Sequence, residues 1–127
     1  MRRVLIIDHD ETRSRVFGRI FRERMGFGVA DEAGDGASAV SLLRAGAYDL
    51  VLLNTVVPST DPVALLDAVI CQPSSPAVLY YAPIDRALFA PLAAGRAVEI
   101  NYPFSMDELR EAIRVADSLR PITHPQA

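Results

Sequence analysis

The chain has 127 residues, of which 50% are hydrophobic, and a formal net charge of -3. This length suits one compact domain with an apolar core, and the negative charge disfavours a general binder of nucleic acids. All 13 cationic side chains are arginines, which excludes mechanisms that need a lysine amine, such as Schiff-base formation.

Three features favour a cytoplasmic protein without a membrane segment. Cys71 is the only cysteine, so no internal disulfide can form, as is typical of a reducing compartment. The apolar run at residues 4–7 is too short for a secretory signal. No run approaches the roughly 20 apolar residues that span a bilayer.

Strands and helices are predicted to alternate along the chain. Short apolar runs, typical of strands buried on both faces of a parallel sheet, cover residues 4–7, 27–33, 50–53, 77–81 and 98–101. Helical patterns cover residues 11–25, 36–45, 62–72, 84–94 and 106–119. Pro91 inside the fourth helix predicts that this helix is short or kinked.

Local signals define two of the helices. The first has an apolar stripe made of Val16, Phe17, Ile20 and Phe21, and Gly26 ends it. Asp61 before Pro62 predicts an N-cap with proline in the first helical position.

The last helix carries the strongest local pattern. Ser105 and Glu108 have the spacing of a capping box. Its apolar stripe should face the sheet and consists of Met106, Leu109, Ile113 and Ala116. Ion pairs between Asp107 and Arg110 and between Glu111 and Arg114 are expected on the outer face.

Repeated strand–helix units with short connections predict one flavodoxin-like, doubly wound α/β domain over residues 1–120, with residues 121–127 as a flexible tail or linker. A five-stranded parallel sheet of order 2-1-3-4-5, with helices on both faces, is the common arrangement at this size. Ligands of such sheets bind beyond the carboxyl ends of the strands at the switch point, which here are Asp8, His9 and Asn54.

Four segments in succession resemble the signature segments of response-regulator receiver domains. They are residues 4–10, residues 49–54 with Pro58, residues 81–82 and residues 102–104. The resemblance extends over about residues 2–119 and implies a module of bacterial two-component phosphorelay signalling. In that family an acidic pair binds magnesium, an aspartate accepts the phosphoryl group, and a hydroxyl residue and a lysine contact it.

The positions that match these functional residues depart from the family pattern, which suggests a pseudo-receiver. The acidic pair is Asp8 and His9, the phosphoacceptor is Asn54, the hydroxyl residue is Tyr81 and the lysine is Tyr102. An amide lacks the charged oxygen that forms an aspartyl phosphate. Magnesium prefers several carboxylate oxygens, so we expect weak or absent magnesium binding, with Asp8 as the only weak candidate ligand.

Structural roles are alternatives for several of these residues. Asp10 can be only a helix N-cap, and Asn54 can cap the turn that follows it. His9 can be a surface histidine. Tyr81 and Tyr102 are expected to fill the vacant polar pocket with their rings, with the hydroxyls outward.

The leading functional hypothesis is a phosphorylation-independent protein-interaction module, without enzymatic activity. Its expected partners are a histidine kinase, a phosphotransfer protein or an output domain, and a homodimer is left open. Glu99 stands where receivers carry a switching aromatic residue, so the usual switch is in doubt. The alternatives are a receiver phosphorylated on Asp8 or Asp10 and a small-ligand binder that uses the same crevice.

Arginines crowd the first helix, where Arg13, Arg15, Arg19, Arg22 and Arg24 fall within one short segment. Such a run is either a solvated helix face or a contact surface for an acidic partner. Arg15, Arg19 and Arg22 share one side of the helix and are the candidate partner surface. The outer face of the last helix is a second candidate. Neither membrane nor direct nucleic-acid binding is expected.

Overall fold

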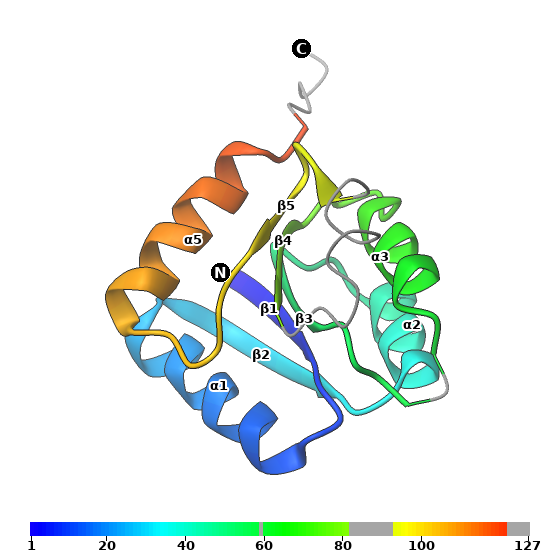
Figure 1. Cartoon of the computed structure of the whole chain (residues 1–127), viewed down its shortest axis with the longest axis horizontal. Helices are drawn as coiled ribbons and strands as arrows, with labels where there is room; N and C mark the ends of the chain where they lie inside the picture. Colours follow the sequence, from blue (N-terminus) through cyan, green and yellow to red (C-terminus); the bar gives the residue numbers. More distant parts are fainter. Residues whose placement is uncertain (59, 82–92, 122–127) are drawn as a thin grey trace.

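The chain forms a five-stranded parallel sheet with the strand order β2-β1-β3-β4-β5 (Figure 1). The computed structural model describes residues 1–58, 60–81 and 93–121. The strands are β1 (Arg2–Ile7), β2 (Phe27–Ala33), β3 (Leu50–Asn54), β4 (Ala77–Tyr81) and β5 (Ala97–Glu99). The helices are α1 (Glu11–Arg24), α2 (Gly36–Ala45), α3 (Pro62–Ile70) and α5 (Met106–Ser118). The predicted flavodoxin-like topology is confirmed.

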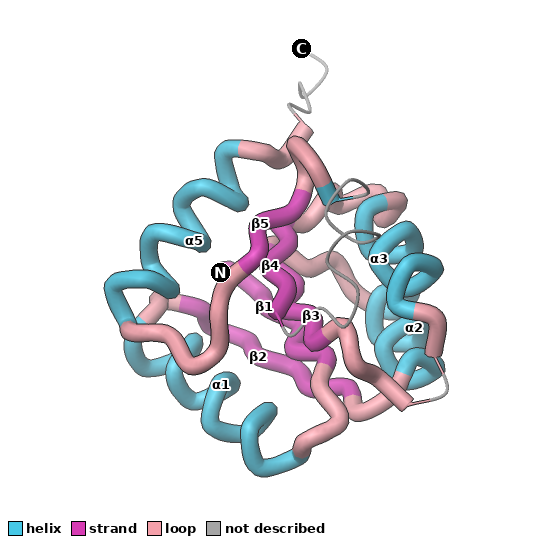
Figure 2. Tube along the Cα trace, viewed as in Figure 1, coloured by secondary structure: helices cyan, strands magenta, loops and turns pink. Residues whose placement is uncertain are grey.

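Helices cover both faces of the sheet, with α1 and α5 on one side and α2 and α3 on the other (Figure 2). Side chains of a strand alternate between the two faces, so Val4 and Ile6 contribute to the core under α1 and α5, whereas Leu5 and Ile7 contribute to the core under α2 and α3. All four are fully buried. Burial of each such side chain stabilises the fold by about 1.5–3 kcal/mol, which explains the continuous apolar run of β1.

Side-chain caps fix where the helices begin. The carboxylates of Asp10, Asp35 and Asp61 accept hydrogen bonds from backbone N–H groups in the first turns of α1, α2 and α3. Both hydrogen bonds of the predicted capping box between Ser105 and Glu108 are present at the start of α5. The predicted ion pairs on the outside of α5 are also present.

Two predictions about the helices and strands are wrong, and a third falls on residues that the structure does not describe. Val16 is 52% exposed because the buried stripe of α1 runs through Phe17 and Phe21, together with two small residues, and a neighbour in sequence points about 100° away on a helix. The last strand covers Ala97–Glu99 instead of residues 98–101, since Ala97 already pairs with Val78. The predicted helix at residues 84–94, with Pro91, lies almost wholly outside the described residues.

Within the described ranges, no helix is both long and apolar enough to cross a bilayer.

Candidate functional site

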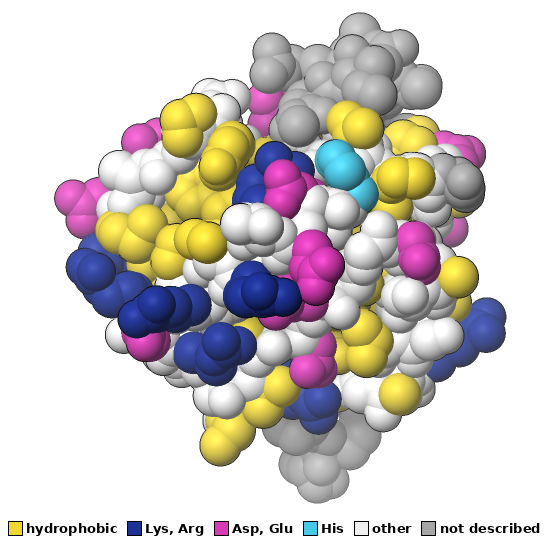
Figure 3. All heavy atoms as spheres, turned by 90° about the horizontal axis from the view of Figure 1, so that it is seen from below, with side chains coloured by type: hydrophobic (Ala, Val, Ile, Leu, Met, Phe, Trp, Pro, Cys, Tyr) yellow, Lys and Arg dark blue, Asp and Glu magenta, His cyan; other side chains and the backbone are white. Residues whose placement is uncertain are grey.

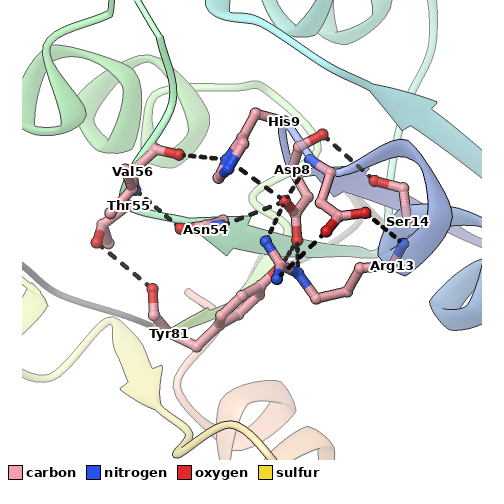
Figure 4. Close-up of polar contacts among 9 residues, drawn as sticks. Asp8, His9, Arg13, Ser14, Asn54, Thr55, Val56 and Tyr81 are labelled. Carbon is pink, nitrogen blue, oxygen red and sulfur yellow. Dashed lines mark hydrogen bonds and ion pairs between the residues drawn. The ribbon is translucent and has the colours of Figure 1, made fainter.

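The sheet register brings the predicted site residues together. β1 lies beside β3, with Ile7 opposite Leu53. Asp8, which directly follows β1, therefore lies next to Asn54, the last residue of β3. Asn54 in turn pairs with Tyr81 at the end of β4. Three side chains that are far apart in the sequence therefore meet at the carboxyl ends of adjacent strands (Figure 4).

The carboxylate of Asp8 is the centre of this site and is fully engaged by donors. Only 1% of the residue is exposed. Arg13 donates from Nε to Oδ2 over 2.6 Å and from Nη2 to Oδ1 over 2.8 Å. Oδ1 also accepts from the backbone N–H of Asp10 at 2.9 Å and from Nδ2 of Asn54 at 3.2 Å. The hydroxyl of Tyr81 donates to Oδ2.

Arg13 is the functional residue that the sequence analysis missed, because it was grouped with the arginines of a solvated or partner-facing surface. Its backbone N–H is held by the Asp10 cap at 2.9 Å, which orients the first turn of α1 so that the side chain reaches back to Asp8. Its guanidinium carbon lies 6.0 Å from the ring centre of Tyr81 and 5.6 Å from that of Tyr102. The usable signal was the spacing: a cation in the first helical turn after a buried strand-end carboxylate.

The ionisation of the site follows from these contacts. Burial alone would raise the pKa of Asp8, but the hydrogen bonds from Arg13 and Tyr81 outweigh burial and hold that pKa below its usual value. The hydrogen bond to Asp8 raises the pKa of Arg13. Burial, followed by the bond to Asp8, raises the pKa of the Tyr81 phenol. Asp8 and Arg13 therefore form a charge-neutral pair.

Asn54 and His9 both hold the loop that follows β3. The backbone N–H of Val56 donates to Oδ1 of Asn54 over 2.9 Å, so the turn-capping alternative for Asn54 is confirmed. Nδ1 of His9 lies 2.9 Å from the carbonyl oxygen of Val56 and 3.6 Å from Oδ1 of Asp8. Because both neighbours are acceptors, Nδ1 carries the hydrogen.

The orientation predicted for Tyr81 is wrong. Its hydroxyl points inward to Asp8, because a buried phenol needs a hydrogen-bond partner and the carboxylate supplies one. Tyr102 is 52% exposed, and its ring makes edge contact with Phe17 at 5.8 Å between centres. Glu99 lies in β5 opposite Tyr80.

The candidate partner surface on α1 is exposed but partly neutralised. Arg15 pairs with Glu11 at 3.1 Å and Arg19 pairs with Glu23 at 3.0 Å, whereas Arg22 is exposed. Seen from below, basic side chains gather on one side of the molecule beside hydrophobic ones (Figure 3).

Relatives of the chain are bacterial regulators. The sequence is 32% identical over 124 residues to the transcriptional regulatory protein PdtaR of Mycobacterium tuberculosis, covering 96% of this chain and 60% of that protein. It is 30% identical over 119 residues to the transcriptional regulatory protein ResD of Bacillus subtilis, covering 93% and 48%. The chain thus spans about half to three-fifths of the length of these relatives. No protein-family model matches the chain.

Solved structures with the same fold include a receiver domain and a chemotaxis protein. The receiver domain of a Francisella response regulator superposes with a TM-score of 0.73 at 24% identity, covering 93% of this chain and 98% of that one. The chemotaxis protein CheY4 of Vibrio cholerae superposes with a TM-score of 0.76 at 17% identity, covering 91% and 98%. The homologues and structural neighbours of the chain are therefore response regulators and their receiver domains.

Proposed function

We propose that the chain is a pseudo-receiver of two-component signalling, which acts through protein–protein contacts and is not switched by phosphorylation. The observation that carries this proposal is the occupation of Asp8 by Arg13 and Tyr81 beside an amide at the phosphoacceptor position. We assign no enzymatic activity to it.

The missing nucleophile is the first support for this proposal. Forming an aspartyl phosphate requires a carboxylate oxygen at the end of β3, and Asn54 offers an amide there. The amide oxygen already accepts from Val56, and the amide nitrogen donates to Asp8. Phosphoryl transfer depends on positioned charge around the reacting group, and this network presents N–H donors in place of a second carboxylate.

The residues of the site do not fit a magnesium ion, which the receiver resemblance implies. Magnesium needs oxygen ligands in near-octahedral geometry, but both Asp8 oxygens accept hydrogen bonds from Arg13. The guanidinium supplies the positive charge that a metal would supply. Magnesium would have to displace Arg13, so no step of our proposal passes through a metal.

Phosphorylation of Asp8 or Asp10 is less favoured by the geometry. Asp8 is 1% exposed and its oxygens are engaged, so a phosphodonor cannot approach without breaking the ion pair. Asp10 is more accessible, but its Oδ1 caps α1 and its Oδ2 lies 3.8 Å from Nη1 of Arg13. Among the described residues, no group of three or more acidic, histidine or cysteine side chains is placed to hold a metal ion.

A small-ligand site in the same crevice is also less favoured. The rings of Tyr81 and Tyr102 and the guanidinium of Arg13 fill the space beside Asp8. A hollow of about 570 Å³ lies instead between α2 and α3, near Thr60, Ala64 and Arg44.

The exposed side of α1 is the partner surface we favour, through Arg15, Arg19 and Arg22. Histidine kinases, phosphotransfer proteins and output domains are the partner classes that fit a signalling module, and self-association into a homodimer is a further arrangement. Charge reversal at Arg19 and Arg22 should weaken binding of an acidic partner, and this loss should be salt-sensitive, larger at low than at high ionic strength. Reversal at Arg110 and Arg114 tests the other candidate face, on α5. Unchanged binding by the α1 variant, or equal loss in both variants, would contradict the assignment to α1.

The proposal is tested by incubating the protein with acetyl phosphate and magnesium and measuring its intact mass. We expect no phosphorylated species, while a receiver with an aspartate at the acceptor position, treated in parallel, gains one phosphoryl group. A phosphorylated form of this chain, located at Asp8 or Asp10 by peptide mapping, would overturn the proposal.

A further inference from the structure

A second arginine lies partly buried in the turn that precedes β5, at the end of the sheet opposite the Asp8 site. Among the residues that the structure describes, Nη1 and Nη2 of Arg96 have no hydrogen-bond partner although both atoms are buried. Most buried polar groups in folded proteins are hydrogen-bonded, and an unpaired buried cation is especially costly. The two nitrogens therefore require a partner that the described part of the chain does not supply.

Arg120, which follows α5, is the charged neighbour of Arg96, and its guanidinium is held by two backbone carbonyl groups. Its Nε donates to the carbonyl oxygen of Ser75 over 2.8 Å, and its Nη2 donates to that of Ser74 over 3.0 Å. Its Nη1 lies 3.8 Å from Oδ1 of Asp49. Arg120 is thus fixed in place and adds positive charge beside Arg96.

No carboxylate of the described residues compensates Arg96. Asp49 is shared between Arg120 and the backbone N–H of Arg3, which donates to its Oδ2 over 2.8 Å. Burial, together with the charge of Arg120, lowers the pKa of Arg96 below its usual value. The local field consequently favours a negatively charged ligand.

We propose that Arg96, with Arg120 beside it, is a binding site for a small oxyanion at the end of the sheet opposite Asn54. The Nη1 and Nη2 edge of a guanidinium presents two parallel N–H donors, which match two oxygens of a carboxylate or a phosphate group. Arg96 stands in the turn directly after Gly95 and is partly exposed as a residue, so the site lies at the surface of the molecule. The inference is independent of the proposed signalling function.

Thermal unfolding tests the site with inorganic phosphate and acetate as separate probes, at constant ionic strength set with sodium chloride. For the wild type, we expect the midpoint temperature of unfolding to rise with the concentration of one of these anions and to reach a plateau. A ligand that binds only the folded state stabilises that state. A response to phosphate alone identifies a phosphate ligand, and a response to acetate identifies a carboxylate. A midpoint unchanged by both anions would overturn the proposal.

The variant Arg96→Met shows whether Arg96 binds the anion or has only a structural role. Removal of an uncompensated buried cation should leave the midpoint in chloride equal to or above that of the wild type, and should abolish the response to the anion. Arg114→Met, at an exposed arginine paired with Glu111, should keep the full response. If Arg96→Met responds like the wild type, the anion binds elsewhere and the assignment is wrong.

An NMR titration of the wild type gives a second readout that does not depend on the variant. The side-chain Nε–H signal of Arg96 should shift saturably with the stabilising anion, while that of Arg114 stays in place. Equal, unsaturated shifts at both arginines would indicate general ion effects and would contradict the site.

Discussion

Both oxygens of the Asp8 carboxylate face the guanidinium of Arg13, with Nε 2.6 Å from Oδ2 and Nη2 2.8 Å from Oδ1. This two-pronged geometry is the strongest form of a side-chain ion pair. It joins the end of β1 to the first turn of α1 with no exposure of the carboxylate side chain. The pocket therefore carries its own counter-ion.

Removal of this counter-ion should destabilise the protein. Arg13→Met leaves Asp8 buried without its cation, and loss of one partner of a buried pair costs about 3–5 kcal/mol. Because the Arg13 side chain is 23% exposed, water can replace part of the interaction, and we expect a loss of about 2–3 kcal/mol. Urea unfolding measures it.

Arg15→Met is the matched control, since Arg15 makes only an exposed ion pair with Glu11. Such pairs contribute about 0–1 kcal/mol. Adding Asp8→Asn to Arg13→Met should recover part of the lost stability, because the double variant has no unpaired charge. Equal losses for Arg13→Met and Arg15→Met would show that the buried pair contributes nothing specific.

The Tyr81 hydroxyl should contribute separately. Tyr81→Phe keeps the ring but removes one donor to Asp8, and hydrogen bonds to charged groups contribute about 1.5–3 kcal/mol. Since Asp8 retains its other donors, we expect a loss near the lower limit, about 1.5 kcal/mol. Tyr102→Phe, at a ring that is 52% exposed, should change the unfolding free energy by less than about 0.5 kcal/mol. The opposite ranking would contradict the inward orientation of the Tyr81 hydroxyl.

The lowered pKa of Asp8 predicts a particular acid response. Its folded-state pKa lies below the unfolded value of about 3.9, so the unfolded state binds the proton first. The stabilisation by this carboxylate is thus fully present above about pH 4 and is lost as the pH falls through the folded-state pKa.

Asp8→Asn isolates this contribution. The difference in unfolding free energy between the wild type and Asp8→Asn should be large at pH 7 and should narrow below about pH 4. Denaturant unfolding at a series of pH values measures the difference. A constant difference across that range would mean that Asp8 does not titrate as the structure implies.

The fold was predictable because each of its determinants is local in the sequence. Residues 27–33 and 77–81 were predicted as strands with the bounds that the structure shows, since apolar runs between turn signals encode buried strands directly. The Ser105 cap and the Asp61–Pro62 start were predicted because their hydrogen bonds lie within one turn of helix.

The site was only partly predictable because it depends on where long side chains reach. The topology was enough to bring Asp8, Asn54 and Tyr81 together. The spacing of Asp8 and Arg13 was compatible with a pair but did not fix where the Arg13 side chain points, because an arginine can either extend into solvent or fold back over the strand ends. The inward turn of the Tyr81 hydroxyl follows from the buried carboxylate, which is visible only once the side chains are placed.

Restoring the missing aspartate should not restore a working receiver. In Asn54→Asp, a carboxylate replaces an amide nitrogen that donates to Oδ1 of Asp8 over 3.2 Å. Two close carboxylates raise the pKa of one of them, and the single cation, Arg13, is already bonded to both Asp8 oxygens. We expect a destabilised variant that gains no phosphoryl group from acetyl phosphate by intact mass. Efficient phosphorylation of Asn54→Asp alone would show that the rest of the pocket is functional.

Rebuilding the family pattern should fail for the same reason while Arg13 remains. A variant that combines Asn54→Asp with His9→Asp, Tyr81→Thr and Tyr102→Lys supplies the acidic pair, the hydroxyl and the lysine. The guanidinium of Arg13 still competes with magnesium for Asp8, so this fourfold variant should bind the ion only weakly.

Adding Arg13→Ser should give saturable magnesium-dependent amide shifts at positions 8 and 54, with phosphorylation appearing only after magnesium binding. Loss of the Tyr81 ring costs several kcal/mol by the precedent of large-to-small core substitutions, so amide spectra must first show that both variants fold. If the fourfold variant binds magnesium as tightly as the fivefold variant, Arg13 does not occupy the place of the metal, and our account of the pocket is wrong.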